Sequence, residues 1–244
     1  MYMIRKVLKE LKDNETAGNH NVPVSINLSR ADFDNHNLVN DICVMVDDAK
    51  VDRKLINIEI TESLVGSDFE FMKKQIENLQ SHGFKVWMDD FGSGYSSLKV
   101  LQNIKFDLIK FDMDFMKHLD EGNDGKIIIS QMIKMVSSLG IDTLCEGVET
   151  KEQYRFLQEG GCSKLQGYYF MKPSPGEELL KKYKGKGDDG FEDPKVSDYY
   201  DAVGRVNLFD LSFLANLDDN ILKNTFDTVP MSVMEVDEEN EKLI

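Results

Sequence analysis

Residues 87–98 read W-M-D-D-F-G-S-G-Y-S-S-L, and this stretch decides how the rest of the chain is interpreted. An apolar run ends in two adjacent carboxylates, Asp89 and Asp90, and a turn containing Gly92 and Gly94 follows directly. Adjacent like charges repel each other, and successive side chains of a strand point to opposite faces. The pair therefore indicates a cation at the carboxyl end of a strand. The glycines indicate a turn with positive φ angles.

The flanking sequence alternates between short apolar runs and amphipathic helical patterns. The predicted strands cover residues 24–28, 56–60, 84–88, 106–111, 143–146 and 166–170. Helical spacing predicts two core-facing sets, namely Phe69, Met72, Ile76 and Leu79, and then Ile128, Met132, Met135, Val136 and Leu139. Strands that alternate with helices predict a parallel α/β sheet. We expect a TIM-like barrel with six of its eight strands in residues 1–183, and a doubly wound sheet is the alternative.

Polar residues gather at or just beyond the carboxyl ends of the predicted strands. They are Asn27, Glu59, Glu62, Asp89, Asp90, Lys110, Asp112, Glu146 and Gln166. One acidic residue in such a place is usually a helix cap. In a β/α barrel, however, these ends converge on one face, and that face holds the active site. The whole series therefore predicts a functional site.

Composition excludes several classes of function. The net charge of −15 argues against binding to a nucleic-acid polymer or to an anionic membrane surface. No apolar run approaches the roughly 18 residues that a membrane-spanning helix needs. Three cysteines without C-x-x-C spacing and four scattered histidines do not favour a zinc site. We expect a cytoplasmic protein with free thiols.

The ligand types at the strand ends favour hard metal ions. Asn27, Glu59, Asp89, Asp90 and Glu146 supply only oxygen atoms, which Mg²⁺ and Mn²⁺ prefer. Two such ions suit in-line attack on a phosphodiester. Lys110, one strand further on, has several open roles: to orient or deprotonate a water, to stabilise a leaving oxygen, or to form a structural ion pair.

Six motifs occur in order over residues 1–183: S-I-N-L-S-R, I-E-I-T-E-S, D-D-F-G-S-G-Y-S-S-L, K-F-D, E-G-V-E-T and L-Q-G-Y-Y-F-M-K-P. In these motifs the chain resembles the EAL-domain cyclic di-GMP phosphodiesterases. The resemblance implies a TIM-like barrel in which two ions of Mg²⁺ or Mn²⁺ drive hydrolysis of cyclic di-GMP to linear pGpG.

The same resemblance implies roles for individual residues. The metal ligands would be Asn27, Glu59, Asp89, Asp90 and Glu146, and the catalytic residues Lys110, Glu146 and Asp89. Asp112 and Gln166 would support the site. Glu62 and Glu149 would brace the loop 90–98, which contains Gly92 and Gly94 and which the family links to metal binding and to a homodimer contact.

The chain also departs from the family pattern. The E-A-L segment, with its metal-binding glutamate and substrate-binding arginine, does not occur in these 244 residues. We expect it upstream of Met1, together with two barrel strands. Residues 184–195 are predicted to be a glycine- and charge-rich linker. Residues 196–244 are predicted to hold a helical segment and the opening of a PAS-like sensor module, with a strand, a turn and a second strand at the end.

Three hypotheses about function follow. The first is a cyclic di-GMP phosphodiesterase whose activity is impaired by truncation. The second is a non-catalytic module that binds cyclic di-GMP or a protein partner. The third is an unrelated Mg²⁺-dependent barrel enzyme, such as an enolase-type lyase, which shares the ring of carboxylates but does not explain the loop after Asp89 or Lys110.

Overall fold

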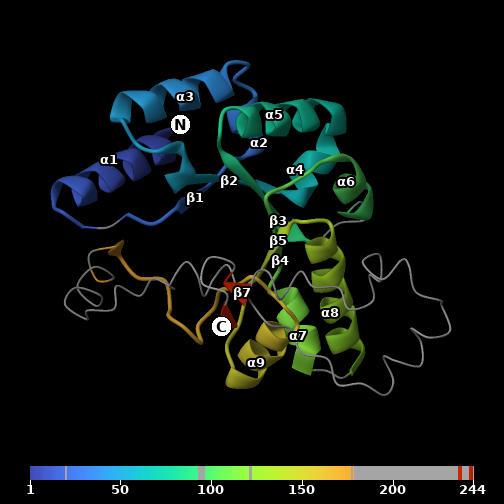
Figure 1. Ribbon diagram of the computed structural model, residues 1–244. Coiled ribbons are helices and arrows are strands. Elements are labelled where there is room, and N and C mark those ends of the chain that lie inside the picture. Colours follow the sequence, from blue (N-terminus) through green and yellow to red (C-terminus); the bar gives the residue numbers. More distant parts are fainter. Residues whose placement is uncertain are drawn as a thin grey trace.

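A sheet of six parallel strands forms the centre of the protein. The computed structural model describes residues 1–19, 21–92, 97–120, 123–176, 178, 236–237 and 242–243. The strands are β1 (Val24–Asn27), β2 (Ile56–Thr61), β3 (Lys85–Phe91), β4 (Leu108–Phe111), β5 (Asp142–Cys145) and β6 (Lys164–Leu165). Their order in the sheet is their order in the sequence, whereas a doubly wound sheet reverses at a switch point. The strands curl into half of a barrel, which confirms the predicted α/β architecture (Figure 1).

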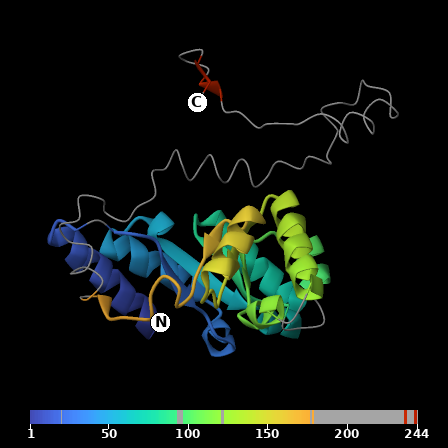
Figure 2. The same ribbon diagram turned by 90° about the horizontal axis from the view of Figure 1, so that it is seen from below.

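Helices form an arc around the strands (Figure 1). They are α1 (Tyr2–Thr16), α2 (Arg30–Phe33), α3 (Leu38–Ala49), α4 (Glu62–Ser67), α5 (Phe69–Ser81), α6 (Ser97–Asn103), α7 (Asp114–Asp120), α8 (Asn123–Ser138) and α9 (Lys151–Glu159), with a 3-10 turn η1 (Arg53–Leu55). Helix α1, in blue, and helix α8, in yellow-green, lie on opposite sides of the half-barrel (Figure 2).

The two faces of the sheet differ in chemistry. On β3, Val86 and Met88 are fully buried in the hydrophobic core, while the alternate residues Trp87 and Asp89 are half-buried. Because strand side chains alternate between faces, the apolar set packs against the helices and the polar set lines the inner side of the half-barrel. Asn27, Glu59, Asp89 and Lys110 therefore share the inner face.

One strand lies earlier in the chain than predicted. Residues 166–170 were expected to form the sixth strand, but β6 covers Lys164–Leu165 and the residues after it form a turn. Gly167 passes so close to the backbone of Val148 that any larger residue would collide with it. Two of the following rings, Tyr169 and Phe170, pack on Tyr154 of α9. This ring packing and the close approach at Gly167 replace the extended conformation that the aromatic composition favoured.

Of the two predicted helix faces, one is confirmed. In α5, the residues Met72, Ile76 and Leu79 are buried and Phe69 packs against the core.

The predicted face of α8 is confirmed in part. Val136 is buried, and Met132 and Met135 pack against the core. The buried side chains of this helix are Ile129, Ile133 and Val136, whereas Ile128 and Leu139 are 54% and 51% exposed. Two apolar stripes run side by side along this helix, and both have helical spacing. Periodicity alone cannot choose between them.

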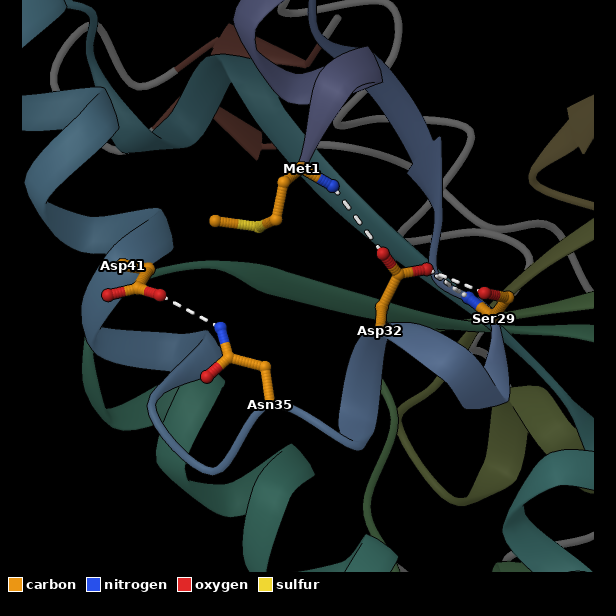
Figure 3. A network of polar contacts seen from close by, with 5 residues as sticks. All are labelled: Met1, Ser29, Asp32, Asn35 and Asp41. Atoms are coloured by element: carbon orange, nitrogen blue, oxygen red, sulfur yellow. Dashed lines mark hydrogen bonds and ion pairs between the residues drawn. The ribbon is translucent and has the colours of Figure 1, made fainter.

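The connection after β1 is held by a small polar network (Figure 3). Asp32 accepts hydrogen bonds from the amide and the hydroxyl of Ser29, at 2.9 and 2.6 Å, and lies 3.4 Å from the amino group of Met1. Burial raises the pKa of Asp32, but these hydrogen bonds and the positive charge outweigh it and lower the pKa. Asn35 then donates to Asp41 on α3 at 2.8 Å. The network fixes how the chain leaves the strand that carries Asn27.

The far C-terminal part is described only in two short pieces. Strands β7 (Val236–Asp237) and β8 (Lys242–Leu243) form an antiparallel pair, in agreement with the two predicted strands, and the predicted turn between them lies outside the described residues. The predicted linker at 184–195 and the other residues of 196–244 lie outside the described residues, and the PAS-like module stays a prediction. In the part of the chain that is described, no helix is long and apolar enough to cross a membrane.

The corrected face of α8 can be tested by substitution. We expect Ile133→Ala to lower the free energy of unfolding by about 2–5 kcal/mol, because it leaves a cavity in the core. The matched variant Ile128→Ala removes the same atoms from an exposed position and should change it by no more than about 0.5 kcal/mol. Urea denaturation measures both. Equal losses of unfolding free energy in the two variants would contradict the burial of Ile133 and the exposure of Ile128.

Candidate active site

The candidate site residues lie at or just after the carboxyl ends of the parallel strands. Asn27 is the last residue of β1 and pairs in register with Glu59 of β2. On the next strand, Asp89 pairs with Thr61. Glu146 follows β5 directly, and its amide donates to Phe111 at the end of β4. Parallel pairing thus brings residues that are far apart in sequence to one edge of the sheet.

The ammonium group of Lys110 is the centre of this site. Its Nζ atom lies 3.0 Å from Oε2 of Glu59, 2.9 Å from Oδ1 of Asp89 and 2.9 Å from Oε1 of Glu146. The lysine side chain is only 7% exposed. One cation therefore joins carboxylates from β2 and β3 and from the loop that follows β5.

The surroundings of Lys110 keep it protonated. Burial alone would lower its pKa, but hydrogen bonds to Asp89 and Glu146 and the charge of Glu59 outweigh burial and raise the pKa well above its ordinary value. In this arrangement the ammonium is a hydrogen-bond donor and a counter-charge. Of the roles left open by the sequence, deprotonation of a water is therefore the least favoured.

Asp90 is held in a strained backbone conformation. Its φ angle is +56°, which few residues other than glycine adopt, and the register between β3 and β4 shifts at this point. Its amide donates to Oδ1 of Asp89 at 3.1 Å. Burial is the main cause that raises the pKa of Asp90, and the charges of Asp89, Asp112 and Glu146 add to it. Strain and repulsion at one acidic residue indicate a site that a further cation would stabilise.

The turn after Asp90 is fixed by two contacts. Gly92 has a φ angle of +94°, as the glycine spacing predicted, and a Cβ atom there would collide with the ring of Phe115. The amide of Gly92 donates to Oε2 of Glu62 at 2.9 Å, and Glu62 is only 3% exposed. Glu62 thus braces the start of the loop. Gly94 lies outside the described residues.

The other predicted residues surround this centre without touching Lys110. Asn27 and Gln166 are exposed at the ends of β1 and β6. The carboxylate of Asp112 accepts from the amide of Asp114 and caps α7. Glu149 is exposed after β5, and no hydrogen bond or ion pair links it to residues 90–92.

Trp87, in the apolar run before Asp89, is a further residue of the inner face. It is half-buried, lies on the same face of β3 as Asp89, and pairs in register with Glu59. Its buried indole N–H finds no acceptor among the described residues. The sequence indicates this placement, because Trp87 is two residues from Asp89 and residues two apart on a strand share a face. Phe91 and Phe111, in contrast, are fully buried.

The donor set fits a divalent metal ion in type, and three of its carboxylates are in contact with the ammonium of Lys110. Carboxylate and amide oxygens suit Mg²⁺ or Mn²⁺. In this structure the ammonium of Lys110 contacts one oxygen of each of three of these carboxylates, at 2.9–3.0 Å. Within the described residues, no three side chains of His, Cys, Asp or Glu form a metal-holding group on their own. A divalent ion would therefore compete with Lys110 for the same oxygens.

Comparisons with known proteins agree with this geometry. The family model of the EAL domain matches residues 1–173. A cyclic di-GMP phosphodiesterase of Pseudomonas aeruginosa, NbdA, is 28% identical over 186 residues, which are 75% of this chain and 24% of that protein. The first curated relatives are much longer, since the chain spans only 17% to 29% of their length.

Two solved structures resemble the fold and were determined with ligands. The phosphodiesterase PaMucR in complex with cyclic di-GMP has a TM-score of 0.68 and 28% identity, covering 73% of this chain and 72% of that one. BlrP1 of Klebsiella pneumoniae, in a manganese and cyclic di-GMP complex, has a TM-score of 0.63 and 27% identity, covering 70% and 44%.

The raised pKa of Asp90 predicts a pH-dependent stability difference. An acid with a higher pKa in the folded state makes the protein less stable as pH rises from its ordinary pKa of about 3.9 towards the raised value. Without metal, Asp90→Asn should therefore be more stable than the wild type at pH 7, and the gap should shrink as pH falls towards 3.9.

Urea midpoints measured with EDTA at several pH values test this expectation. Asp48→Asn, on the exposed side of α3, is the matched control. Its urea midpoint should differ from that of the wild type by the same amount at every pH. A gap at Asp90 that does not change with pH would mean that asparagine acts only through its tolerance of a positive φ angle.

The competition at Lys110 gives a second prediction. Lys110→Met keeps the apolar stem but leaves three carboxylates without their cation, so we expect the metal-free protein to lose about 3–5 kcal/mol of stability. Mn²⁺ should then raise the melting temperature of this variant more than that of the wild type. Lys134→Met on the exposed side of α8 is the control. Equal Mn²⁺ shifts in all three proteins would refute competition.

Proposed function

We propose that the site binds cyclic di-GMP and hydrolyses one phosphodiester bond to give linear pGpG. The basis is that this chain belongs to the EAL domain family. The observation that carries the proposal is the convergence of Glu59, Asp89 and Glu146 on the single ammonium of Lys110. Such a group of oxygen ligands and one fixed positive charge suits phosphoryl transfer. The match over residues 1–173 leaves no reason to retain the lyase alternative.

The chemistry divides between the residues as follows. Glu59, Asp89, Asp90 and Glu146, together with Asn27, would hold two ions of Mg²⁺ or Mn²⁺. Such ions, when bound, polarise phosphoryl oxygens and lower the pKa of water.

The residues of the chain itself orient the reactants. We assign to the protonated Lys110 the orientation of the attacking water and the stabilisation of charge on the phosphoryl oxygens. Asp89 and Glu146 are the more exposed of its three partners, at 14% and 21% against 7% for Glu59, and we assign to them the acceptance of the proton from the water. Glu62, by binding Gly92, keeps the two adjacent aspartates in position.

The non-catalytic module stays the second candidate. The observation that favours it is that Lys110 already neutralises the carboxylates without any metal ion. The described residues also supply six parallel strands, and the sequence contains no E-A-L segment. We therefore propose that this polypeptide by itself turns over cyclic di-GMP more slowly than intact members of the family.

Two further points are also proposals. The family resemblance supports a homodimer contact through the loop 90–98, of which residues 93–96 lie outside the described residues. The composition supports a location in the cytoplasm.

The test combines binding and turnover on the purified 244-residue chain. We expect calorimetry with Ca²⁺ to detect cyclic di-GMP binding, and chromatography with Mn²⁺ to detect slow formation of pGpG. Asp89→Asn should reduce turnover at least 100-fold, because it removes a charge shared by the metal ligands and Lys110. Asp48→Asn should behave as the wild type.

The outcomes separate the candidates. Binding without any pGpG would favour the non-catalytic module, and turnover that survives Asp89→Asn would refute the assigned site. If neither binding nor turnover is detected, both functions fail for this chain. A rate equal to that of intact family members would refute the proposed impairment.

A further inference from the structure

Two free cysteines lie in direct contact beside the site. The Sγ atoms of Cys145 and Cys162 are 3.4 Å apart, and neither thiol is in a disulfide. Cys145 is the last residue of β5, and Cys162 lies in the turn between α9 and β6. The sequence does not indicate this contact, because no C-x-x-C spacing links the two residues. The parallel pairing of β5 with β6 brings them together.

The turn that carries Cys162 is fixed against β5. Ser163 and Thr143 exchange hydrogen bonds: the amide of Ser163 donates to Oγ1 of Thr143 at 3.1 Å, and the amide of Thr143 donates to Oγ of Ser163 at 3.2 Å. The amide of Cys162 donates to the carbonyl oxygen of Leu157 at 3.0 Å, and its thiol donates to that of Lys164 at 3.2 Å. The contact between the two sulfur atoms is therefore held from both sides.

The two residues differ in access to solvent. Cys145 is completely buried, while Cys162 is partly exposed. Because exposure controls which thiol meets a dissolved oxidant first, Cys162 is suited to attack and Cys145 to resolve the adduct. A disulfide needs an S–S distance of about 2.05 Å, so the sulfur atoms must approach by only about 1.3–1.4 Å.

We propose that Cys145 and Cys162 form a reversible disulfide, and that the pair is an oxidative modification site for small disulfides such as oxidised glutathione. The thiolate of Cys162 attacks one sulfur atom of the small disulfide, forms a mixed disulfide and releases one thiol. Cys145 then loses its proton, attacks Sγ of Cys162 and releases the second thiol. Two electrons and two protons pass from the protein to the oxidant, which leaves as two thiols.

The pair is coupled to the site through the backbone. Cys145 directly precedes Glu146, whose carboxylate lies 2.9 Å from Lys110, and the carbonyl oxygen of Cys145 accepts from the amide of Gln166 at 2.9 Å. The approach of the sulfur atoms pulls the end of β5 towards the helix-facing side of the sheet. It therefore draws Glu146 away from Lys110. This consequence rests on the proposed function, since it matters only if Glu146 acts in catalysis or metal binding.

The test counts thiols in the purified 244-residue chain. The protein is equilibrated in buffers with increasing ratios of oxidised to reduced glutathione, alkylated and digested. We expect loss of two of the three free thiols and one cross-linked peptide that joins Cys145 to Cys162, reversed by dithiothreitol. Cys43→Ser should form the same cross-link, and Cys162→Ser should form none. Cys162→Ser is preferred to a change at Cys145, whose burial risks misfolding, and a melting curve verifies its fold.

The outcomes distinguish failure of the disulfide proposal from failure of the proposed function. Three alkylatable thiols in fully oxidised glutathione would refute the proposal, as would a glutathione adduct on Cys162 that never resolves. A bond that includes Cys43 would refute it too. In the turnover assay, oxidation should lower pGpG formation several-fold in the wild type and leave oxidised Cys162→Ser unchanged. An inactive protein that still forms the cross-link would refute the proposed function and leave the dithiol site standing.

Discussion

The contact of one ammonium group with three carboxylates is the constraint on which the rest of the site depends. Glu59, Asp89 and Glu146 cannot be buried together unless a cation neutralises them, and Lys110 supplies it from the strand between β3 and β5. The parallel sheet makes this arrangement possible, because it brings the carboxyl ends of successive strands to one edge. The same requirement explains why the side chain of Lys110 can be buried to the point of being only 7% exposed.

The apolar outer face of the sheet gives this polar centre its rigidity. Val86 and Met88 anchor β3 in the core up to the residue before Asp89. Beyond that point the strand departs from regular geometry, with a positive φ angle at Asp90 and a turn held by Glu62. Strain of this kind persists only where the surroundings impose it. Here the buried carboxylate of Glu62 and the ring of Phe115 provide the restraint.

Much of the fold and of the site could be predicted from the sequence, for specific reasons. Five strands and the face of α5 follow from hydrophobic periodicity, and the polar residues at the strand ends follow from barrel geometry. The face of α8 could be predicted only in part, because two apolar stripes one residue apart satisfy the same period. The end of β6 is set by a close approach of Gly167 to Val148, and the contact of Cys145 with Cys162 by strand pairing. These are properties of tertiary packing that no local pattern contains.

The position of Trp87 has a practical consequence. It is the single tryptophan of the chain, it lies on the inner face of β3 two residues before Asp89, and its indole N–H has no acceptor among the described residues. All tryptophan fluorescence of this protein therefore originates beside the cluster of charges. Its emission reports the polarity and the occupancy of that cluster, and a paramagnetic ion bound there quenches it. The chain carries its own optical probe, and no label has to be introduced.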